Sequence, residues 1–350
     1  MIELDGSQHS GSGTLVRFSV AFVALLGEPL RVVNARARRP KPGLRAQHVA
    51  AVRACAELCG ATLEGVEVGA RAFVFRPGPR VAGGRFVWEI GTAGSATMLA
   101  LGILPVACLA DAPIEAIIHG GTVQDFAPPP EHVIHVLAPL VARMGARVEL
   151  RLVRPGYVPG GEGEIALEIE PAPRGLAALE LLERGAVDRV CGVARASHLA
   201  NRRVAERMAA TCEAGLAGAG LAVQIERADD LSALHPGAGL AVWTASTTGA
   251  RFGADRAGAR GRSAESVGAF VASQLLDDLA GTATTDRHLA DQLVPFAALA
   301  TGTSRWRVPV ESDHLAANLW LVERFGTQVR REGPLVEVTG LGAIPRRSRR

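Results

Sequence analysis

Lysine is almost absent from this sequence. Lys41 is the only one, and the other 37 of the 38 basic residues are arginines. An enzyme that uses a lysine as its nucleophile therefore has a single candidate here. A ligase that carries its adenylate on lysine needs the pattern Lys-x-Asp-Gly, whereas Pro42 and Gly43 follow Lys41, which argues against that class. Other phosphate contacts must come from arginine, whose planar guanidinium matches phosphate geometry.

Cysteine pairs, a leader peptide and a long apolar span are also missing. The five cysteines form no Cys-x-x-Cys pattern, so we expect buried thiols rather than a metal site or disulfides. The N-terminus lacks a basic-then-apolar leader. The uncharged run from Gly91 to Leu109 contains Pro105 and opens with small polar residues, which predicts a buried helix rather than a membrane span. We therefore expect a cytoplasmic protein with no membrane contact.

The composition is that of a globular protein. With 350 residues, 48% of them apolar and 21% charged, the chain can bury the core of one large domain and a smaller one. The net charge of +3 is weak support for a polyanionic partner. No obligate protein partner is evident.

A unit of secondary structure recurs along the chain. In it an amphipathic helix is followed by a glycine, which suits the left-handed conformation that closes a helix, and then by an alternating strand. Repeated units of this kind predict an α/β fold in which helices cover the sheets. The pattern is clearest for helix 47–59 with strand 61–68, helix 131–144 with strand 146–153, and helix 314–325 with strand 327–338.

The middle of the chain differs from the rest in composition and in its pattern of predicted elements, which suggests an insertion. Residues 184–276 contain their own helix and strands and a stretch rich in glycine and arginine. We expect them to form a small α/β domain inserted into a large repeat domain of residues 1–183 and 277–340. The remaining residues, 341–350, end in four arginines around one serine and are expected to form a disordered basic tail.

A glycine-rich loop lies near the N-terminus, between a short strand and a helix. It spans residues 5–14, and backbone amides at such a helix start can bind an anion. It is not a Walker loop, because Ser12 stands where a lysine is required, and Val16 replaces the third glycine of a dinucleotide-binding loop. By itself the loop is equally consistent with a tight turn and with a phosphate site.

A basic loop follows the next predicted strand. Arg36, Arg38, Arg39 and Lys41 lie close together, and Pro40 and Pro42 stiffen the segment that presents them. Guanidinium groups bind phosphate in a bidentate manner. A solvated basic loop and a phosphate-binding loop both fit this pattern.

The last predicted helix opens with a histidine. Ser312 or Asp313 can cap it, which places His314 in the first turn with its apolar neighbours facing inward. The positive end of the helix dipole disfavours imidazolium, so the ring is expected to stay neutral and nucleophilic near pH 7. Asn318, one turn further on, is placed to orient the ring. A purely structural histidine fits the same local pattern.

Taken together and in order, these segments resemble the RNA 3′-terminal phosphate cyclase family over nearly the whole chain. The resemblance implies a large domain of three βαβαββ units and a smaller inserted α/β domain. The matching residues are Asp5-Gly6-Ser7-Gln8, Lys41-Pro42-Gly43-Leu44, Gln47-His48, Ala93-Gly94-Ser95, Gly120-Gly121-Thr122, Ala127-Pro128-Pro129, Gly156-Tyr157-Val158-Pro159-Gly160-Gly161, Glu183-Arg184-Gly185, Leu289-Ala290-Asp291-Gln292 and Ser312-Asp313-His314-Leu315.

The resemblance also implies a reaction and its participants. The imidazole at the position of His314 attacks the α-phosphorus of ATP, and the resulting AMP passes to the 3′-terminal phosphate of an RNA. The neighbouring 2′-hydroxyl then expels AMP and closes a 2′,3′-cyclic phosphate. ATP and a divalent metal, Mg²⁺ or Mn²⁺, are implied, with Asp291 near the metal. The nucleotide-binding positions implied are His288, Leu289, Ala290, Asp291, Gln292, Arg36, Arg39, Gln47 and Pro128.

The sequence departs from the family pattern at several polar positions. A glutamate that helps to place metal and triphosphate is replaced by Ser10, and a glutamine of the same loop by Thr14. A nucleotide-contacting glutamine is replaced by Leu101, and an acidic residue after Gly-Gly-Thr by Val123. His288 takes the place of the tyrosine that opens the nucleotide-binding segment.

Two alternatives remain beside an active cyclase. The lost polar residues favour a catalytically weakened, cyclase-like RNA-binding protein, whereas the presence of His314 argues against it. Enolpyruvyl transferases share related repeat units, but they use lysines as well as arginines around their anionic substrate, and this chain has only Lys41.

Overall fold

The first six elements form one compact repeat unit. The computed structural model describes residues 1–344. Helices α1 and α2 each end at a glycine in the left-handed conformation, Gly27 with φ 78° and Gly60 with φ 65°, as the sequence predicted. The strand predicted over residues 61–68 covers only three of them. The elements are β1 (Ile2–Asp5), α1 (Gly13–Leu26), β2 (Leu30–Val33), α2 (Ala46–Cys59), β3 (Thr62–Glu64) and β4 (Phe73–Arg76).

The second unit repeats this order. The uncharged run forms a buried helix, as predicted, in which Ser95 caps the N-terminus by accepting a hydrogen bond from the backbone N–H of Met98 at 3.1 Å. The helix predicted over residues 131–144 forms with a π-helical turn in its middle. The elements are β5 (Gly84–Glu89), α3 (Ala96–Ala107), β6 (Ile114–Gly120), α4 (Pro130–His132), η1 (Val133–Leu137), α5 (Ala138–Arg143), β7 (Arg147–Arg154) and β8 (Gly163–Glu170).

The third unit begins with a short strand and resumes after a long interruption. The single strand predicted over residues 327–338 is wrong: two antiparallel strands form instead, because the chain turns at Gly333, which has φ 55°. The elements are β9 (Glu180–Leu181), α8 (Leu289–Gln292), α9 (Val294–Leu299), β14 (Thr303–Arg307), α10 (Asp313–Glu323), β15 (Gln328–Glu332) and β16 (Leu335–Thr339).

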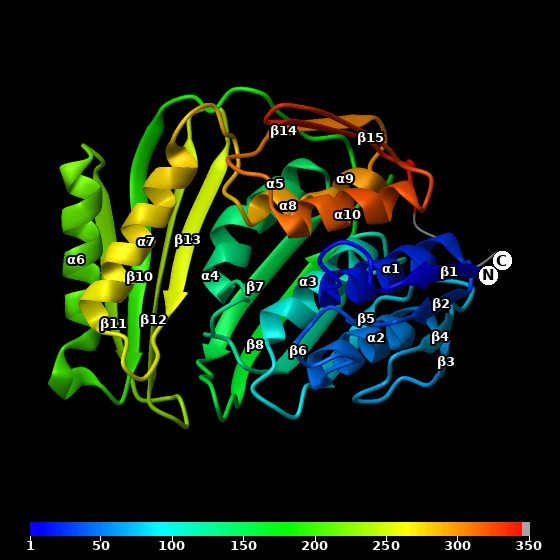
Figure 1. The fold of residues 1–350 in the computed structure, drawn as a ribbon, viewed down its shortest axis with the longest axis horizontal. Helices are drawn as coiled ribbons and strands as arrows, with labels where there is room; N and C mark the ends of the chain where they lie inside the picture. The colour runs from blue at the N-terminus through cyan, green and yellow to red at the C-terminus, as the bar shows by residue number, and fades with distance from the viewer. Residues whose placement is uncertain (345–350) are drawn as a thin grey trace.

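The sheets of these three units share one topology. In each, the first strand pairs in parallel with the second, and the fourth lies antiparallel between the second and the third: β1-β2-β4-β3, β5-β6-β8-β7 and β9-β14-β16-β15. Their helices pack on one another, α1 against α2, α3 and α10, and a single hydrophobic core runs through all three units. The predicted α/β fold of three βαβαββ units is confirmed (Figure 1).

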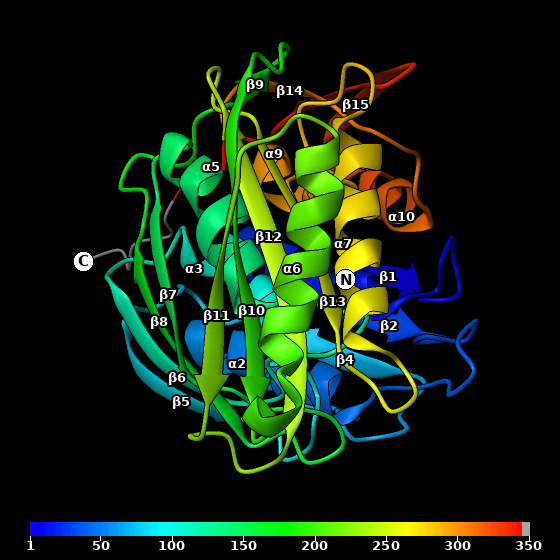
Figure 2. The same cartoon turned by 90° about the vertical axis from the view of Figure 1, so that its left-hand side faces the viewer.

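A fourth sheet interrupts the third unit and has its own core. Figure 2 shows α6 and α7 side by side over one face of this sheet, whose order is β11-β10-β12-β13. Its core uses residues between 190 and 283, and we propose residues 184–276 as the inserted domain. The elements are β10 (Val187–Ser197), η2 (Ala200–Arg202), α6 (Val204–Gly218), β11 (Val223–Asp230), β12 (Gly237–Ser246), β13 (Arg251–Ala257) and α7 (Ala264–Leu279).

Polar and aromatic contacts hold the inserted sheet against the large domain. The hydroxyl groups of Tyr157 and Ser197 lie 2.9 Å apart, and the rings of His135 and Trp243 stack with their centroids 3.9 Å apart. The backbone N–H of Gly253 donates to the carboxylate of Asp286 at 2.9 Å. These contacts fix the position of β13 relative to α8, which bears on the site described below.

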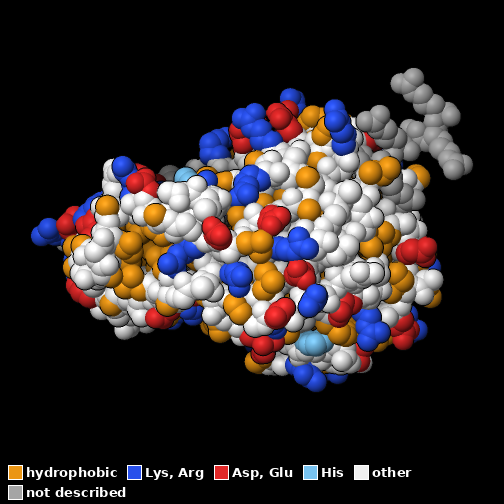
Figure 3. Space-filling model, turned by 90° about the horizontal axis from the view of Figure 1, so that it is seen from above, with side chains coloured by type: hydrophobic (Ala, Val, Ile, Leu, Met, Phe, Trp, Pro, Cys, Tyr) orange, Lys and Arg blue, Asp and Glu red, His pale blue; other side chains and the backbone are white. Residues whose placement is uncertain are grey.

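Among residues 1–344, no helix combines the length and apolarity needed to cross a membrane. Seen from above, basic and acidic side chains are interspersed over the face of the molecule (Figure 3). The cytoplasmic location stays a prediction, and most of the expected basic tail, residues 345–350, lies outside the described residues.

Candidate active site

A cavity of about 620 Å³ lies where the large domain meets the inserted one. Its volume is in the range of pockets that hold a single small ligand, roughly 300–1,000 Å³. Its walls come from the starts of α1 and α10, the basic loop, α8, the loop before α4, and β13 with α7 of the insert. The lining residues are Ser12, Gly13, Thr14, Arg17, Phe18, Arg36, Arg39, Pro40, Gln47, His48, Met98, Leu101, Asp125, Phe126, Ala127, Pro128, Asp255, Arg256, Phe270, Gln274, His288, Asp291, Gln292 and His314.

His314 lies in the first turn of α10 and faces this cavity. Ser312 caps the helix by accepting a hydrogen bond from the backbone N–H of Leu315 at 3.1 Å, while Leu315 is fully buried and anchors the turn. The imidazole Nδ1 lies 3.5 Å from the hydroxyl of Ser12. His314 thus lies in the first turn of the helix, as the sequence predicted, and its ring faces the cavity.

The electrostatic surroundings of His314 favour a neutral ring. Partial burial lowers the pKa of the imidazole, and the positive charges of Arg39 and Arg17 lower it further, against a smaller opposing effect of Asp313. A neutral imidazole carries a free lone pair on one ring nitrogen and can act as a nucleophile.

Asp291 faces the cavity from α8 and is held there by the neighbouring helix. The amide nitrogen of Asn318 donates to the backbone oxygen of Asp291 at 3.0 Å and to its carboxylate at 3.1 Å. The expectation that Asn318 orients the imidazole is wrong, because its buried side chain points to α8 instead. Burial, reinforced by the charge of Asp286, raises the pKa of Asp291 to about 7.

Of residues 288–292, three side chains reach the cavity, those of His288, Asp291 and Gln292. The side chains of Leu289 and Ala290 are fully buried in the main core. Loss of surrounding water lowers the pKa of His288 to about 4, although part of the ring is reached from the cavity. The carboxylate of Asp286 accepts hydrogen bonds from the backbone N–H groups of His288 at 2.8 Å and Leu289 at 2.7 Å, which fixes the start of this segment.

Arginines bring positive charge to the cavity. Arg17, Arg36 and Arg39 line it. Within the described part of the chain, the Nε atoms of Arg17 and Arg36 are buried without a hydrogen-bond partner, and so is Oε1 of Gln292. Buried polar groups without a protein partner are unusual in folded proteins, and a ligand is one way to satisfy them. Guanidinium groups in this state suit a phosphate.

Gln47 and Pro128, two further predicted positions, line the cavity and are held by hydrogen bonds to residues of the second unit. Oε1 of Gln47 accepts a hydrogen bond from the backbone N–H of Ser95 at 3.1 Å. The backbone oxygen of Pro128 accepts one from the hydroxyl of Thr97 at 2.6 Å. All the residues predicted to bind the nucleotide therefore meet at one cavity, except for the buried side chains of Leu289 and Ala290.

Several residues of the cavity were missed by reasoning from the sequence. Arg17 is the only charged residue of α1 and is 4% exposed; a lone charge within an apolar helix was the available signal. Burial lowers its pKa to about 10, and the charge of Asp291 opposes that shift. Arg256, Phe270 and Gln274 come from the insert, and no local motif marks them.

The carboxylates and histidines of the site do not form a ready-made metal cage. Among residues 1–344 no group of three or more histidine, cysteine, aspartate or glutamate side chains has the arrangement of a metal site. Asp291 is the carboxylate nearest to such a role, and Ser10 and Leu101 supply no carboxylate or amide. A divalent ion here would take most of its oxygen ligands from phosphates and water, as Mg²⁺ often does.

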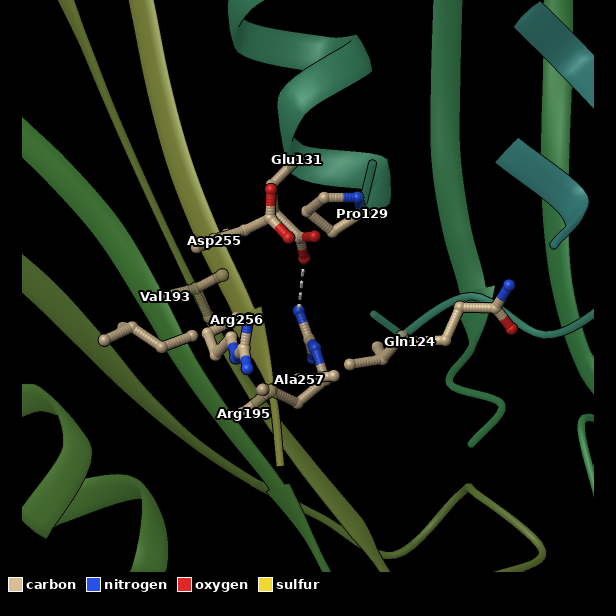
Figure 4. A pocket seen from close by; sticks show the side chains of 12 residues that line it. Gln124, Pro129, Glu131, Val193, Arg195, Asp255, Arg256 and Ala257 are labelled. Carbon is tan, nitrogen blue, oxygen red and sulfur yellow. Dashed lines mark hydrogen bonds and ion pairs between the residues drawn. The ribbon is translucent and has the colours of Figure 1, made fainter. Parts of the chain in front are cut away.

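A second, smaller cavity of about 20 Å³ adjoins the first and shares Asp255 and Arg256 with it. Figure 4 shows it between α4 and the inserted sheet, with the ion pair of Arg195 and Glu131 at 3.3 Å marked by a dashed line. Burial raises the pKa of Asp255 to about 7. The junction of the two domains is therefore a buried, charged wall of the larger cavity.

Comparison with known proteins places this site in a family. The model of the family described as RNA 3′-terminal phosphate cyclase matches residues 8–330. The chain is 40% identical over 331 residues to the RNA 3′-terminal phosphate cyclase of Methanopyrus kandleri, covering 93% of each chain. It is 42% identical over 310 residues to the protein of that name from Hyperthermus butylicus, covering 87% of this chain and 86% of that one. It is 40% identical over 332 residues to the one from Methylococcus capsulatus, covering 93% and 91%.

A solved structure, the enolpyruvyl transferase NikO from Streptomyces tendae, aligns with a TM-score of 0.41 and 13% identity over 99% of this chain and 50% of that one. That likeness is too weak to carry an argument. The family model and the relatives span nearly all of the sequence, including the segments that build the cavity. The chain belongs to the RNA 3′-terminal phosphate cyclase family.

Proposed function

We propose that this chain is an ATP-dependent RNA 3′-terminal phosphate cyclase that works through a covalent adenylate on His314. The observation that carries the proposal is the meeting, in one cavity, of His314, whose surroundings lower its pKa, and arginines whose buried Nε atoms lack partners. A nucleophilic nitrogen beside phosphate-binding groups is what nucleotidyl transfer requires. The family membership supports the same reaction.

In the first step, Nε2 of His314 attacks the α-phosphorus of ATP. Nδ1 faces the hydroxyl of Ser12, so a ring with its proton on Nδ1 leaves the lone pair of Nε2 free. The N–P bond forms, the bond to the β-phosphate oxygen breaks, and pyrophosphate leaves. Arg17, Arg36 and Arg39 are placed to bind the negative charge of the phosphates, which grows on the leaving group.

In the second step, an oxygen of the RNA 3′-phosphate attacks the phosphorus of the adenylate. The N–P bond breaks, and the RNA then carries AMP through a pyrophosphate linkage. In the third step, the 2′-hydroxyl attacks the 3′-phosphorus, loses its proton and expels AMP. One ATP is consumed, and the products are AMP, pyrophosphate and the 2′,3′-cyclic phosphate.

A divalent metal ion would neutralise phosphate charge during these steps. We propose that Asp291 contributes the protein ligand, held in place by Asn318. The glutamate of the family pattern that helps to place the metal is replaced by Ser10, and Leu101, in the place of a nucleotide-contacting glutamine, presents an apolar group to the cavity. We therefore expect the metal to be bound chiefly through the triphosphate.

The test is adenylate formation with ATP labelled in its α-phosphate. Wild-type protein is expected to retain label in a bond that is labile in acid and stable in alkali, and His314→Ala to retain none. His119→Ala, a histidine of β6 outside the cavity, is the matched control and should label as the wild type does. Cyclisation is then followed with a 3′-phosphorylated oligoribonucleotide as substrate.

The second candidate function is RNA binding without turnover. The apolar side chain of Leu101 in the cavity wall and the replacement of two loop residues by Ser10 and Thr14 favour it. An absence of adenylate with Mg²⁺ and with Mn²⁺, together with retained binding of the oligoribonucleotide, would establish this alternative and overturn the catalytic proposal.

A further inference from the structure

The loop between β6 and α4 presents an aromatic ring to solvent at the rim of the cavity. The Phe126 side chain is 99% exposed, yet it lines the same cavity as His314. An exposed phenylalanine costs hydration free energy that a buried one avoids. Its position at the edge of a polar cavity therefore calls for a reason beyond packing within the protein.

The backbone at Phe126 adds to this cost. Its φ of 64° places a bulky residue in the left-handed region, which side chains other than glycine, asparagine and aspartate rarely adopt. Such strained conformations persist where the surrounding structure imposes them, and they gather at functional sites.

Anchors on both sides of Phe126 impose this conformation. The carboxylate of Asp125 receives a fork of hydrogen bonds from Arg262 of the insert, at 3.1 and 2.9 Å. On the other side, the hydroxyl of Thr97 binds the backbone oxygen of Pro128 at 2.6 Å. The backbone that carries Phe126 is thus held on both sides, and the ring projects from it at the rim of the cavity.

Cationic and aromatic groups of the insert lie at the same rim. The guanidinium of Arg256 lies 4.4 Å from the ring centroid of Phe270. Nε of the same guanidinium lies 3.6 Å from the carboxylate of Asp125. Both Arg256 and Phe270 line the cavity. Aromatic rings next to arginines are the usual surroundings of single-stranded nucleic acid, because the rings stack on bases and the cations attract phosphates.

From these observations we propose that Phe126 stacks on the base of the 3′-terminal nucleotide of the RNA. The inference rests on the proposed function. The adenine of ATP is the less favoured occupant because a mononucleotide that reacts at His314 lies within the cavity, whereas an almost wholly exposed ring lies at its rim. A polymer must enter through that rim, and its last base stays next to the ribose whose phosphate reacts.

Three variants and two RNAs test the proposal. The RNAs are 3′-phosphorylated oligoribonucleotides that differ only in whether the terminal nucleotide is intact or abasic. Binding is measured by fluorescence anisotropy without ATP, and cyclisation by KM and kcat. Phe126→Ala should raise Kd and KM for the intact RNA roughly 5- to 150-fold, the range for one stacked base, with little change in kcat. Phe126→Trp should restore binding, and Phe126→Leu should not.

The abasic RNA tests the same contact on the wild-type protein, so the outcome does not depend on the folding of a variant. The wild-type protein should bind the abasic RNA more weakly than the intact RNA, by about the factor that Phe126→Ala causes on the intact RNA. Phe126→Ala and the wild type should bind the abasic RNA with the same Kd. Val68→Ala removes an exposed apolar side chain (60% exposed) that does not line the cavity, and it should leave all values unchanged.

Equal binding of both RNAs by the wild-type protein, or unchanged Kd in Phe126→Ala, would overturn the proposal. So would a Phe126→Ala variant in which KM for ATP rises in adenylate formation without RNA, because the ring would then hold adenine. Failure of the proposed function would give a different result: the wild-type protein would form neither adenylate nor cyclic product. The Kd values for the intact and abasic RNAs would still test the stacking proposal in that case.

Discussion

One amide nitrogen of Asn318 holds Asp291 at two points, its backbone oxygen at 3.0 Å and its carboxylate at 3.1 Å. Asn318 lies one turn after His314 on α10, and Asp291 lies on α8. The contact therefore ties the helix that carries the proposed nucleophile to the segment that carries the proposed metal ligand. Asn318 is 1% exposed, so water cannot readily replace the amide.

Asn318→Ala should lower both stability and adenylate formation. The variant removes both hydrogen bonds that the buried Asn318 side chain donates to Asp291, which costs about 1–3 kcal/mol of unfolding free energy. We expect adenylate formation to fall roughly tenfold because the carboxylate loses its orientation. Thermal unfolding and α-labelled ATP measure the two effects. Asn201→Ala, an exposed residue of η2, is the control, and an unchanged rate in Asn318→Ala would contradict the link.

Arg36 and Arg39 differ in what they do for the fold. The guanidinium of Arg36 donates to the backbone oxygens of Lys41 at 2.9 Å and Gly43 at 2.7 Å. The backbone N–H of Arg39 donates to the backbone oxygen of Arg36 at 3.1 Å, but its guanidinium makes no hydrogen bond or ion pair with another of the residues 1–344. Arg36 therefore shapes the basic loop as well as lining the cavity, whereas Arg39 has its donors available for a ligand.

Arg39→Ala should weaken ATP use roughly 10- to 100-fold, the effect of one charged hydrogen bond, and leave the melting temperature unchanged. Arg36→Ala should weaken ATP use as well and should also lower the free energy of unfolding by about 1–3 kcal/mol. The exposed Arg85 supplies the control variant Arg85→Ala. Equal losses of stability in Arg36→Ala and Arg39→Ala would refute the division of roles.

Gly13, at the start of α1, has no room for a side chain. A Cβ added there would lie 1.9 Å from Nε2 of His48, and His48 is buried and held by the backbone N–H of Arg45 at 3.1 Å. Gly13→Ala should cost about 1–3 kcal/mol through overpacking and disturb the loop that carries Ser12. Gly218→Ala, at the exposed end of α6 where nothing lies within 4 Å, should instead stabilise by about 0.4–1 kcal/mol. Denaturant unfolding of the two variants measures the expected loss and the expected gain in the free energy of unfolding.

The sequence was sufficient where structure depends on near neighbours. A cap at Ser312 or Asp313 predicts His314 at a helix start, and the glycines after the helices predict the repeated units, because both signals act within one turn of helix. It failed where distant segments meet. The contact between Asn318 and Asp291 joins residues 27 apart in sequence, and Arg256 reaches the cavity only because the inserted sheet docks there. The hairpin at Gly333 was missed because both of its strands alternate in the same way as one long strand.

Asp255 is a half-buried carboxyl group that should make stability depend on pH. It lines both cavities, and burial raises its pKa to about 7, with the charges of Asp286, Glu131 and Asp125 raising it further and that of His132 opposing. An unfolded aspartate has a pKa of about 3.9. The folded protein therefore binds more protons than the unfolded chain between about pH 4 and 7, and the stability contributed by this proton is lost as pH rises through that window.

Asp255→Asn removes this proton and keeps the shape of the side chain. We expect the variant to be more stable than the wild type at pH 8 by on the order of 2–4 kcal/mol, with the difference shrinking as pH falls below 7 and approaching zero only near pH 4. Melting temperatures at four values between pH 5.5 and 8.5 measure it. Asp188→Asn, with a side chain 82% exposed, should stay within about 0.5 kcal/mol of wild type throughout. A difference between Asp255→Asn and wild type that does not change with pH would show that Asp255 is not protonated in the folded protein, because a carboxylate charged at every pH would be removed with the same effect at each.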